Sequence, residues 1–313
     1  MKFDRHVEHP PNATRVKGRH FDNLYVGAQL LQARDTSGLK WTRFGHAESE
    51  DAVTWNVLVG LVRECDITVP GAIAGVPGGD LLMRDAALLL WNAPVEDSPV
   101  HAQLGAVLQS IQRRIEANPR RPSEIEAVLW NDRLRRLTFI EAKLTSGPGA
   151  CSAVSDSPRI RKPAASCRMF RTDKLPRDNG CSYWGIGTGG AEFSRSFPSD
   201  YVRKHLNFEP PIEAQEERSH CARLYQLMRN ALIGREMADA LSLQGGGSVE
   251  FHLIAIVAAG HFGPRYYCEF AESVKDPEAI RFGLITWQDI GKAVQQSGCQ
   301  PDVVRYIAGH TCL

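Results

Sequence analysis

The fold of this chain is decided by one stretch, Glu124-Ile-Glu-Ala-Val-Leu-Trp-Asn-Asp-Arg-Leu-Arg-Arg-Leu-Thr-Phe-Ile-Glu-Ala-Lys-Leu144. Its apolar residues alternate with polar ones on both sides of Asn131-Asp132, a pair that favours tight turns between strands. The stretch therefore predicts a β-hairpin with a turn of two or four residues at its centre.

One register of this hairpin places Glu126 directly opposite Glu141. Side chains two residues apart share a face of a strand, so Glu126, Glu141 and Lys143 point the same way. The same register extends this face with an apolar floor, in which Val128 pairs with Phe139 and Trp130 pairs with Leu137.

Two carboxylates that face each other across a hairpin indicate that a cation binds between them. Opposed Cβ atoms lie about 4.5–5.5 Å apart in such a pair. Carboxylates at this distance repel each other unless a positive charge sits between them. Mg²⁺ binds through one or two carboxylates while it keeps water and substrate phosphate in its shell. Lys143 is placed to orient the attacking water or to stabilise a charged transition state, so the group is suited to phosphodiester hydrolysis.

The Glu-x-Lys tripeptide alone is weak support, because about one is expected by chance in roughly 300 residues of ordinary composition. Three observations strengthen it. The chain contains no other Glu-x-Lys, the tripeptide ends a hydrophobic strand instead of lying in a charged run, and a second acid occupies the matching cross-strand position.

Residues 123–144 resemble the core of the PD-(D/E)xK restriction-endonuclease-like superfamily. In that family an acid on one strand and a (D/E)-x-K tripeptide on the next bind Mg²⁺, for which Mn²⁺ can substitute, and cut phosphodiester bonds. The resemblance implies that Glu126, Glu141 and the Ala142 carbonyl are metal ligands and that Lys143 is the catalytic lysine. The family's first acid is usually Asp, and Glu126 stands in its place with one more methylene group.

The same resemblance adds two positions on helices. The family's first helix often presents a glutamate to the metal, and residues 50–64 predict a helix that Ser49 caps. Glu50 is the expected ligand and Glu48 the alternative, while compensation of the helix dipole is a structural reason for Glu50. On a later helix Gln226 is expected to point at the site as a further catalytic residue, with a solvated helix face as its alternative.

The remaining pattern predicts an α/β protein. Helices are expected at 50–64, 101–117 and 217–242 and from Trp287 onward, strands at 251–259 and 280–286, and a loop at 70–80. We expect a restriction-endonuclease-like core, in which a central mixed β-sheet is flanked by helices. Residues 1–46 are interpreted as an N-terminal extension. Residues 47–313 are expected to form a single domain with an irregular basic insertion at about 151–211.

This basic insertion is a candidate nucleic-acid contact. Between residues 151 and 177 seven positive side chains minus two negative ones give +5, in a chain of net charge +1. Such a segment can grip phosphates without reading sequence, although a merely soluble loop is the alternative. Tyr183, Trp184 and Phe193 follow it, and aromatic residues can stack on unpaired bases. The expected phosphate contacts are Arg159, Arg161, Lys162, Arg168 and Arg171.

Composition excludes several other classes of protein. The eight cysteines contain no Cys-x-x-Cys pair, and eight in 313 residues do not make a disulfide scaffold. A zinc ion or an iron–sulfur cluster stays open for Cys151, Cys167, Cys181 and Cys221, with buried free thiols as the alternative. The polar first residues lack the apolar core of a signal peptide, so a cytoplasmic location is expected.

The sequence thus predicts a Mg²⁺-dependent nuclease that acts in restriction, phage defence or repair. DNA is the expected substrate and RNA is the alternative. Two alternatives stay open. One is a nuclease fold that no longer cuts and serves as a DNA-binding or complex-forming subunit. The other is an α/β protein with an accidental surface Glu-x-Lys, in which Glu126, Glu141 and Lys143 would face bulk solvent.

Overall fold

A six-stranded mixed sheet forms the centre of the protein. The computed structural model describes residues 14–16, 19–21, 50–64, 67–76, 78–116, 123–144, 149, 151, 180–184, 186–187, 201–208, 220–259 and 265–297. The strand order across the sheet is β12-β11-β8-β7-β5-β6. These strands are β5 (Ala87–Leu90), β6 (Ala93–Pro94), β7 (Ala127–Asn131), β8 (Arg136–Lys143), β11 (Glu250–Val257) and β12 (Arg281–Thr286).

The sheet combines an antiparallel half with a parallel half. β11 is parallel to both of its neighbours, β8 and β12, whereas β8, β7, β5 and β6 are joined by antiparallel pairs. A parallel pair requires a long crossover connection, and α7 (Tyr225–Gly245) lies within the crossover from β8 to β11. The expected α/β fold with a central mixed sheet is confirmed.

The predicted hairpin register is confirmed residue by residue. Val128 pairs with Phe139 and Trp130 pairs with Leu137. The turn spans the four residues 132–135, and it closes because the Asn131 side chain accepts a hydrogen bond from the Leu134 N–H at 3.0 Å. Arg135 ends the turn in the left-handed region, with a φ of 51°. This register brings Glu126 beside Glu141, immediately beyond the pair between Ala127 and Ile140.

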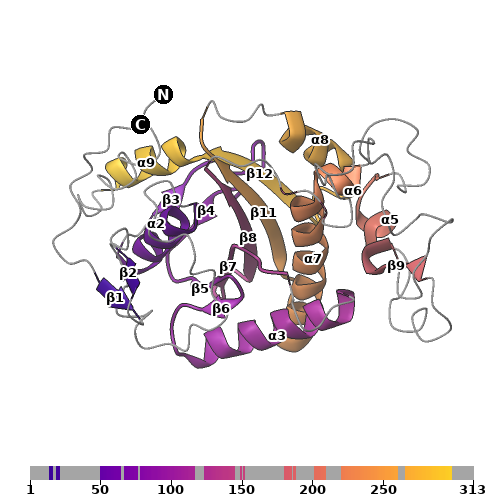
Figure 1. Cartoon of the computed structure of the whole chain (residues 1–313), viewed down its shortest axis with the longest axis horizontal. Coiled ribbons are helices and arrows are strands. Elements are labelled where there is room, and N and C mark those ends of the chain that lie inside the picture. The colour runs from indigo at the N-terminus through magenta and orange to yellow at the C-terminus, as the bar shows by residue number, and fades with distance from the viewer. Residues whose placement is uncertain are drawn as a thin grey trace.

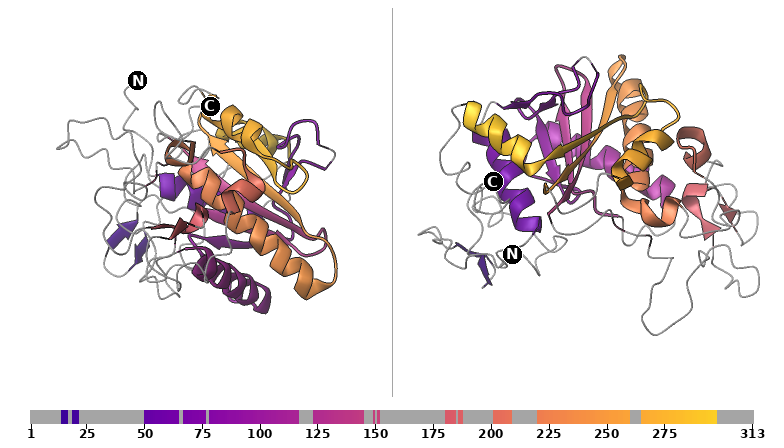
Figure 2. Two further views of the ribbon diagram at one scale, coloured as in Figure 1. Left: turned by 90° about the vertical axis from the view of Figure 1, so that its right-hand side faces the viewer. Right: turned by 90° about the horizontal axis from the view of Figure 1, so that it is seen from above.

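Helices cover both faces of the sheet. Figures 1 and 2 show α2 (Glu50–Glu64) and α9 (Trp287–Gln296) on one face, and α3 (Pro99–Ile115), α7 and α8 (Arg265–Ser273) on the other. Side chains alternate between two buried hydrophobic layers. On β8, Ile140 and Ala142 face the α2 layer, whereas Leu137 and Phe139 face the α7 layer. Glu141 and Lys143 are two and four positions after Phe139 on the same strand, so their side chains lie on the same face and project toward α7.

Most predicted elements are present, with some corrections. α2 has the predicted bounds, whereas α3 begins two residues early because Ser98 caps it and Pro99 occupies its first turn. The helix predicted over 217–242 is interrupted at Leu224, between α6 (His220–Arg223) and α7. α7 runs on to Gly245, where Gly246 ends it in the left-handed conformation. β5 and α8 were not predicted.

The other described elements are short. They are β1 (Thr14–Val16) with β2 (Arg19–Phe21), β3 (Thr68–Val69) with β4 (Leu81–Leu82), β9 (Gly180–Cys181) with β10 (Ile186–Gly187), the 3-10 helix η2 (Ser182–Trp184) and α5 (Tyr201–His205). β9, η2, β10 and α5 lie inside the stretch expected to be an irregular insertion. None of the described helices has the length and apolar composition needed to cross a lipid bilayer.

Candidate active site

Three carboxylates and one ammonium group meet at the end of β8. Glu141 and Lys143 come from β8 itself, Glu126 immediately precedes β7, and Glu50 is the first residue of α2. The Lys143 Nζ lies 2.6 Å from Glu141 Oε1, 2.7 Å from Glu126 Oε1 and 3.4 Å from Glu50 Oε1. The structure therefore brings together the four charged side chains that the sequence singled out.

Backbone amides fix the second oxygen of two of these carboxylates. The Ala142 N–H donates to Glu126 Oε2 at 2.6 Å, and the Leu144 N–H donates to Glu50 Oε2 at 2.7 Å. Each acid is thus tied to the backbone on one side of Lys143 while its other oxygen faces the ammonium group. Ala142, whose carbonyl was expected to be a metal ligand, lies in β8, and its backbone N–H contacts the Glu126 carboxylate.

The backbone of Lys143 is held in place as well. Its carbonyl oxygen accepts hydrogen bonds from the Trp287 Nε1–H and from the Ala258 N–H, both at 3.2 Å. Trp287 begins α9 and Ala258 follows β11, so two further elements converge on this residue. A residue held in this way presents its side chain from a rigid base, as a preorganised site requires.

Burial governs the protonation of the cluster. Glu141 is fully buried, and Glu126 and Lys143 are 6% and 3% exposed. Burial and, next, the carboxylate of Glu141 raise the pKa of Glu126 to about 8, although Lys143 opposes the shift. For Lys143 burial lowers the pKa, but the carboxylates of Glu141, Glu126 and Glu50 outweigh burial and raise it above its usual range. Lys143 is therefore an ammonium ion at any physiological pH.

Asn230 of α7 is a further member of the group, and the sequence did not single it out. It is fully buried, and its Nδ2 donates to Glu141 Oε2 at 2.7 Å. Arg229 fixes the orientation of this amide, because its Nε and Nη2 donate to Asn230 Oδ1 at 3.1 and 3.0 Å. The same Nη2 donates to the Glu124 carbonyl at 3.0 Å. Arg229 and Asn230 therefore connect α7 to the segments that carry both hairpin acids.

Gln226, the residue predicted on this helix, lies one turn before Asn230. Its Oε1 accepts a hydrogen bond from the Gly149 N–H at 2.6 Å, and its own N–H donates to the Gly149 carbonyl at 3.4 Å. Gln226 thus binds the chain that leaves β8, whereas Asn230 contacts Glu141. A signal for Asn230 was present: it is a polar residue within the apolar stripe of the helix, four positions after Gln226.

Several predicted residues lie outside the described part of the chain. They are Glu48, Cys167, Phe193 and the expected phosphate contacts Arg159, Arg161, Lys162, Arg168 and Arg171. Tyr183 and Trp184 are described, and they are 6% and 4% exposed within the hydrophobic layer beneath α7. In this structure the two rings are therefore not exposed for the predicted stacking on unpaired bases. Cys151 is half-buried and Cys221 is buried.

The carboxylates surround the ammonium group of Lys143 in this structure. Among the described residues no three His, Cys, Asp or Glu side chains are arranged to hold a metal ion as they stand. The geometry explains this result, since Lys143 Nζ is within ion-pair distance of all three glutamates. The donors are nevertheless hard oxygens, which suit Mg²⁺. With three ionised carboxylates and one ammonium, the group carries two net negative charges, which matches a divalent cation.

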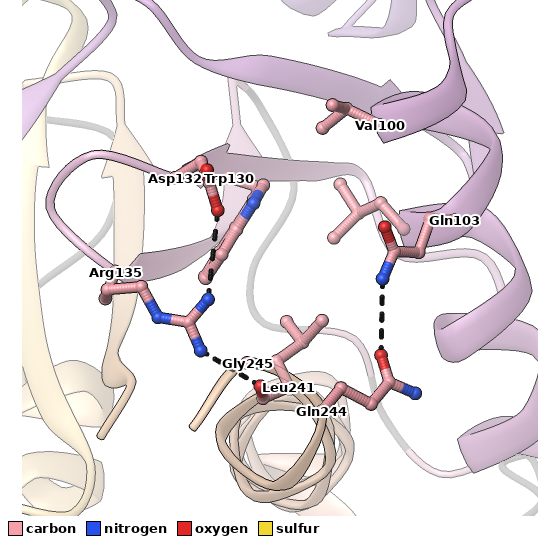
Figure 3. Close-up of a pocket in the computed structure, with 9 residues that line it drawn as sticks. Val100, Gln103, Trp130, Asp132, Arg135, Leu241, Gln244 and Gly245 are labelled. Carbon is pink, nitrogen blue, oxygen red and sulfur yellow. Dashed lines mark hydrogen bonds and ion pairs between the residues drawn. The ribbon is translucent and has the colours of Figure 1, made fainter. Parts of the chain in front are cut away.

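A small pocket lies elsewhere, at the opposite end of the strands. It has a volume of about 90 Å³ and is bounded by the hairpin turn, the start of α3 and the end of α7. Figure 3 shows Arg135 between Asp132 and the Leu241 carbonyl, and Gln103 beside Gln244. Arg135 precedes β8, whereas Lys143 ends it, so this pocket is separate from the carboxylate cluster.

Comparison with known families agrees with this architecture. The family model described as "Restriction Endonuclease associating with ARP" matches residues 28–309, which include the whole central sheet and the carboxylate cluster. Searches among curated proteins and among solved structures each found no match. The family match confirms that the chain resembles restriction endonucleases. Because it spans most of the chain, the protein belongs to the family of restriction endonucleases associating with ARP.

Proposed function

We propose that the protein is a Mg²⁺-dependent nuclease that hydrolyses phosphodiester bonds of DNA. The observation that carries this proposal is the convergence of Glu50, Glu126 and Glu141 on Lys143 at the end of β8. Buried charges are costly unless they are paired, and with all three carboxylates ionised this group has two negative charges to be balanced. The family description supports a nuclease and, as the substrate of restriction endonucleases, DNA.

The proposed metal ligands are Glu50, Glu126, Glu141 and the carbonyl of Ala142. Mg²⁺ bound there would neutralise charge on the phosphate and lower the pKa of a water molecule, which makes that water a nucleophile. Asn230 holds Glu141 by its hydrogen bond to Oε2. This donation leaves Glu141 Oε1, which now contacts Lys143, as the oxygen that would bind metal.

Lys143 acts as a hydrogen-bond donor in this proposal and not as a base. The surrounding carboxylates keep its pKa above its usual range, so the side chain retains its proton. If a cation balanced the carboxylates, the ammonium group would be released to turn toward the reacting phosphate. There it donates to the attacking water or to the charge that develops on the phosphate oxygens as the bond to the leaving oxygen breaks.

Four wider expectations accompany the proposal. Arg159, Arg161, Lys162, Arg168 and Arg171 are proposed to contact the DNA backbone, which would make binding strongly dependent on salt. Residues 47–313 are proposed to act as one nuclease domain, with Gln226 in a supporting role. The biological setting is proposed to be restriction, phage defence or repair in the cytoplasm. Association with an ARP partner is also proposed, because the family description names it.

A cleavage assay with matched lysine variants tests this function. The purified chain is incubated with double-stranded DNA, single-stranded DNA or RNA in Mg²⁺, Mn²⁺ or EDTA. We expect cleavage of DNA that requires metal, and a loss of about 10²–10³-fold in rate for Lys143→Ala. Lys292→Ala is the control, because Lys292 is an exposed residue of α9 near Asp289 and should leave the rate unchanged.

The other results of this assay are informative. Unchanged cleavage by Lys143→Ala would contradict the assignment of the active site to this cluster. Metal-dependent DNA binding by the wild type without any cleavage would favour the alternative function, a nuclease fold that serves as a DNA-binding or complex-forming subunit. Circular dichroism of each variant checks that it has folded, since Lys143→Ala leaves three buried carboxylates without their partner.

A further inference from the structure

Tyr267, in the first turn of α8, carries a buried hydroxyl group without a hydrogen-bond partner among the described residues. The residue is 1% exposed. Buried hydroxyl groups in native proteins are nearly always paired, because an unpaired one loses its bonds to water and gains nothing in return. An unpaired hydroxyl beside a candidate active site points to a ligand that is part of the working protein.

α8 lies on the face of the sheet toward which the carboxylate cluster projects (Figure 1). Val257 at the end of β11 lies opposite Lys143, and the Ala258 N–H donates to the Lys143 carbonyl. The chain then leads into α8, which lies on the same face of the sheet as α7 (Figure 1). This is the face from which Glu126, Glu141 and Lys143 project.

The electrostatic surroundings agree with this placement. Burial raises the pKa of Tyr267 above its usual range, and the next influences on that pKa are the charges of Lys143, Glu141, Glu50 and Glu126. All four charged side chains of the cluster therefore lie within electrostatic reach of one hydroxyl. With its pKa raised, the hydroxyl keeps its proton and is a neutral donor.

We propose that the Tyr267 hydroxyl donates a hydrogen bond to a non-bridging oxygen of the substrate phosphate. This inference rests on the nuclease function proposed above. The carboxylate oxygens already have donors or an ion-pair partner: Glu126 and Glu50 are bound by backbone amides, and Glu141 by Asn230 and Lys143. An arriving phosphate brings acceptor oxygens to the same place, and a neutral donor binds them without competing with the metal for the carboxylates.

This role has a specific energetic signature. A bond to a non-bridging oxygen exists when the substrate is bound, so its loss weakens DNA binding itself. A bond to the attacking water would instead affect the chemical step, and a bond to a carboxylate would affect metal binding. Three separate measurements on one variant therefore distinguish the three roles.

The test uses Tyr267→Phe, which removes only the hydroxyl. Its matched control is Tyr266→Phe, because Tyr266 is the preceding residue of α8 and is 41% exposed. DNA affinity is measured by fluorescence anisotropy of a labelled duplex in Ca²⁺, under conditions in which a gel shows no cleavage. Mn²⁺ affinity is measured without DNA by calorimetry, and kcat is measured in Mg²⁺.

We expect Tyr267→Phe to weaken DNA binding about tenfold or more, as for the loss of a hydrogen bond to a charged oxygen. Mn²⁺ affinity should stay at the wild-type value, and Tyr266→Phe should match the wild type throughout. Unchanged DNA affinity, a lower kcat with unchanged DNA affinity, or weakened Mn²⁺ binding would each overturn the assignment. If the wild-type protein neither binds nor cuts DNA, this result contradicts the proposed nuclease function and, with it, this inference.

Discussion

Lys143 is the counter-ion of the whole cluster, and this has a consequence for metal binding. One ammonium cannot balance three ionised carboxylates, and buried charges without partners are strongly unfavourable. The protein relieves the excess by holding a proton, since the pKa of Glu126 is raised to about 8. A divalent cation would displace this proton and free Lys143 from its role as counter-ion. Metal binding, proton release and mobility of the lysine are therefore coupled.

The affinity of the protein for Mg²⁺ should consequently rise with pH. Glu126 is mostly protonated below pH 8 and must lose its proton to act as a ligand. The apparent affinity should fall about tenfold for each pH unit below about 8 and level off above it. Calorimetry from about pH 6 to about pH 9, in buffers of different ionisation enthalpy, measures both the affinity and the released proton. An affinity independent of pH without proton release would contradict this coupling.

Asn230 should affect metal binding through Glu141. Asn230→Ala removes the donor to Glu141 Oε2 and leaves that buried oxygen unpaired. We expect Mn²⁺ affinity and cleavage to fall by about 10–100-fold, as for other residues that orient a metal ligand. Asn131→Ala is the matched control, because Asn131 is also buried and hydrogen-bonded but lies at the far end of the hairpin. Equal losses of metal affinity in both variants would show a general effect on folding.

At the residue scale, the sequence predicted the members of the site that local geometry determines. Glu126, Glu141 and Lys143 follow from the alternation of strand residues, and Glu50 was expected from the family resemblance, on a helix whose start the sequence marks. Asn230 and Tyr267 were not predicted, because their contacts depend on how α7 and α8 pack on the sheet. Gln226 and Asn230 lie on one helix face, and only the placement of the helix decides which of them contacts Glu141.

At the scale of elements, Gly234 allows α7 to lie close to the sheet. A Cβ at this position would come within 2.1 Å of the Phe251 ring on β11. The glycine therefore sets the distance between helix and sheet, and Asn230 lies one turn before it on the same helix. The close packing of α7 against β11 is what brings the Asn230 amide to 2.7 Å from Glu141.

Two glycine substitutions test this packing. Gly234→Ala should lower the free energy of unfolding by about 1–3 kcal/mol, because the extra methyl group overpacks the interface. Gly105→Ala on α3 is the control, since among the described residues its Cβ would meet only Pro94, at 3.9 Å. There the better helix propensity of alanine should stabilise the protein by up to about 1 kcal/mol. Denaturant titrations measure both values, and equal effects at the two positions would contradict the packing argument.

The elements with a clear periodic pattern were predictable, and those defined by contacts were not. α2 carries both a capping residue and an apolar face, so its bounds could be predicted. β5 is a run of four apolar residues, too short to be distinguished from part of a helix without its partner β7. The break at Leu224 also lacked a signal, because neither proline nor glycine lies there.

At the scale of the whole molecule, the two ends of the sheet carry different groups of charges. The site occupies the end where β8 finishes, and a second group surrounds the start of β11. In this second group Glu250 binds Arg136 and Arg281, each at 3.0 Å. His252 lies beside them, fully buried, and neither ring nitrogen has a hydrogen-bond partner among the described residues. This end of the sheet joins β8, β11 and β12 without any role in the proposed chemistry.

His252 should make the protein less stable in acid. Burial, and next the charge of Arg136, lower its pKa to about 4 from an ordinary 6.5, while Glu250 opposes the shift and Arg281 adds to it. Between these pH values the unfolded chain binds a proton that the folded protein does not, so the free energy of unfolding falls as pH drops from 6.5 toward 4. The loss should approach about 3 kcal/mol for this residue. Denaturant titrations across this range should show a smaller loss for His252→Leu than for the wild type, whereas parallel curves would mean that another group controls acid stability.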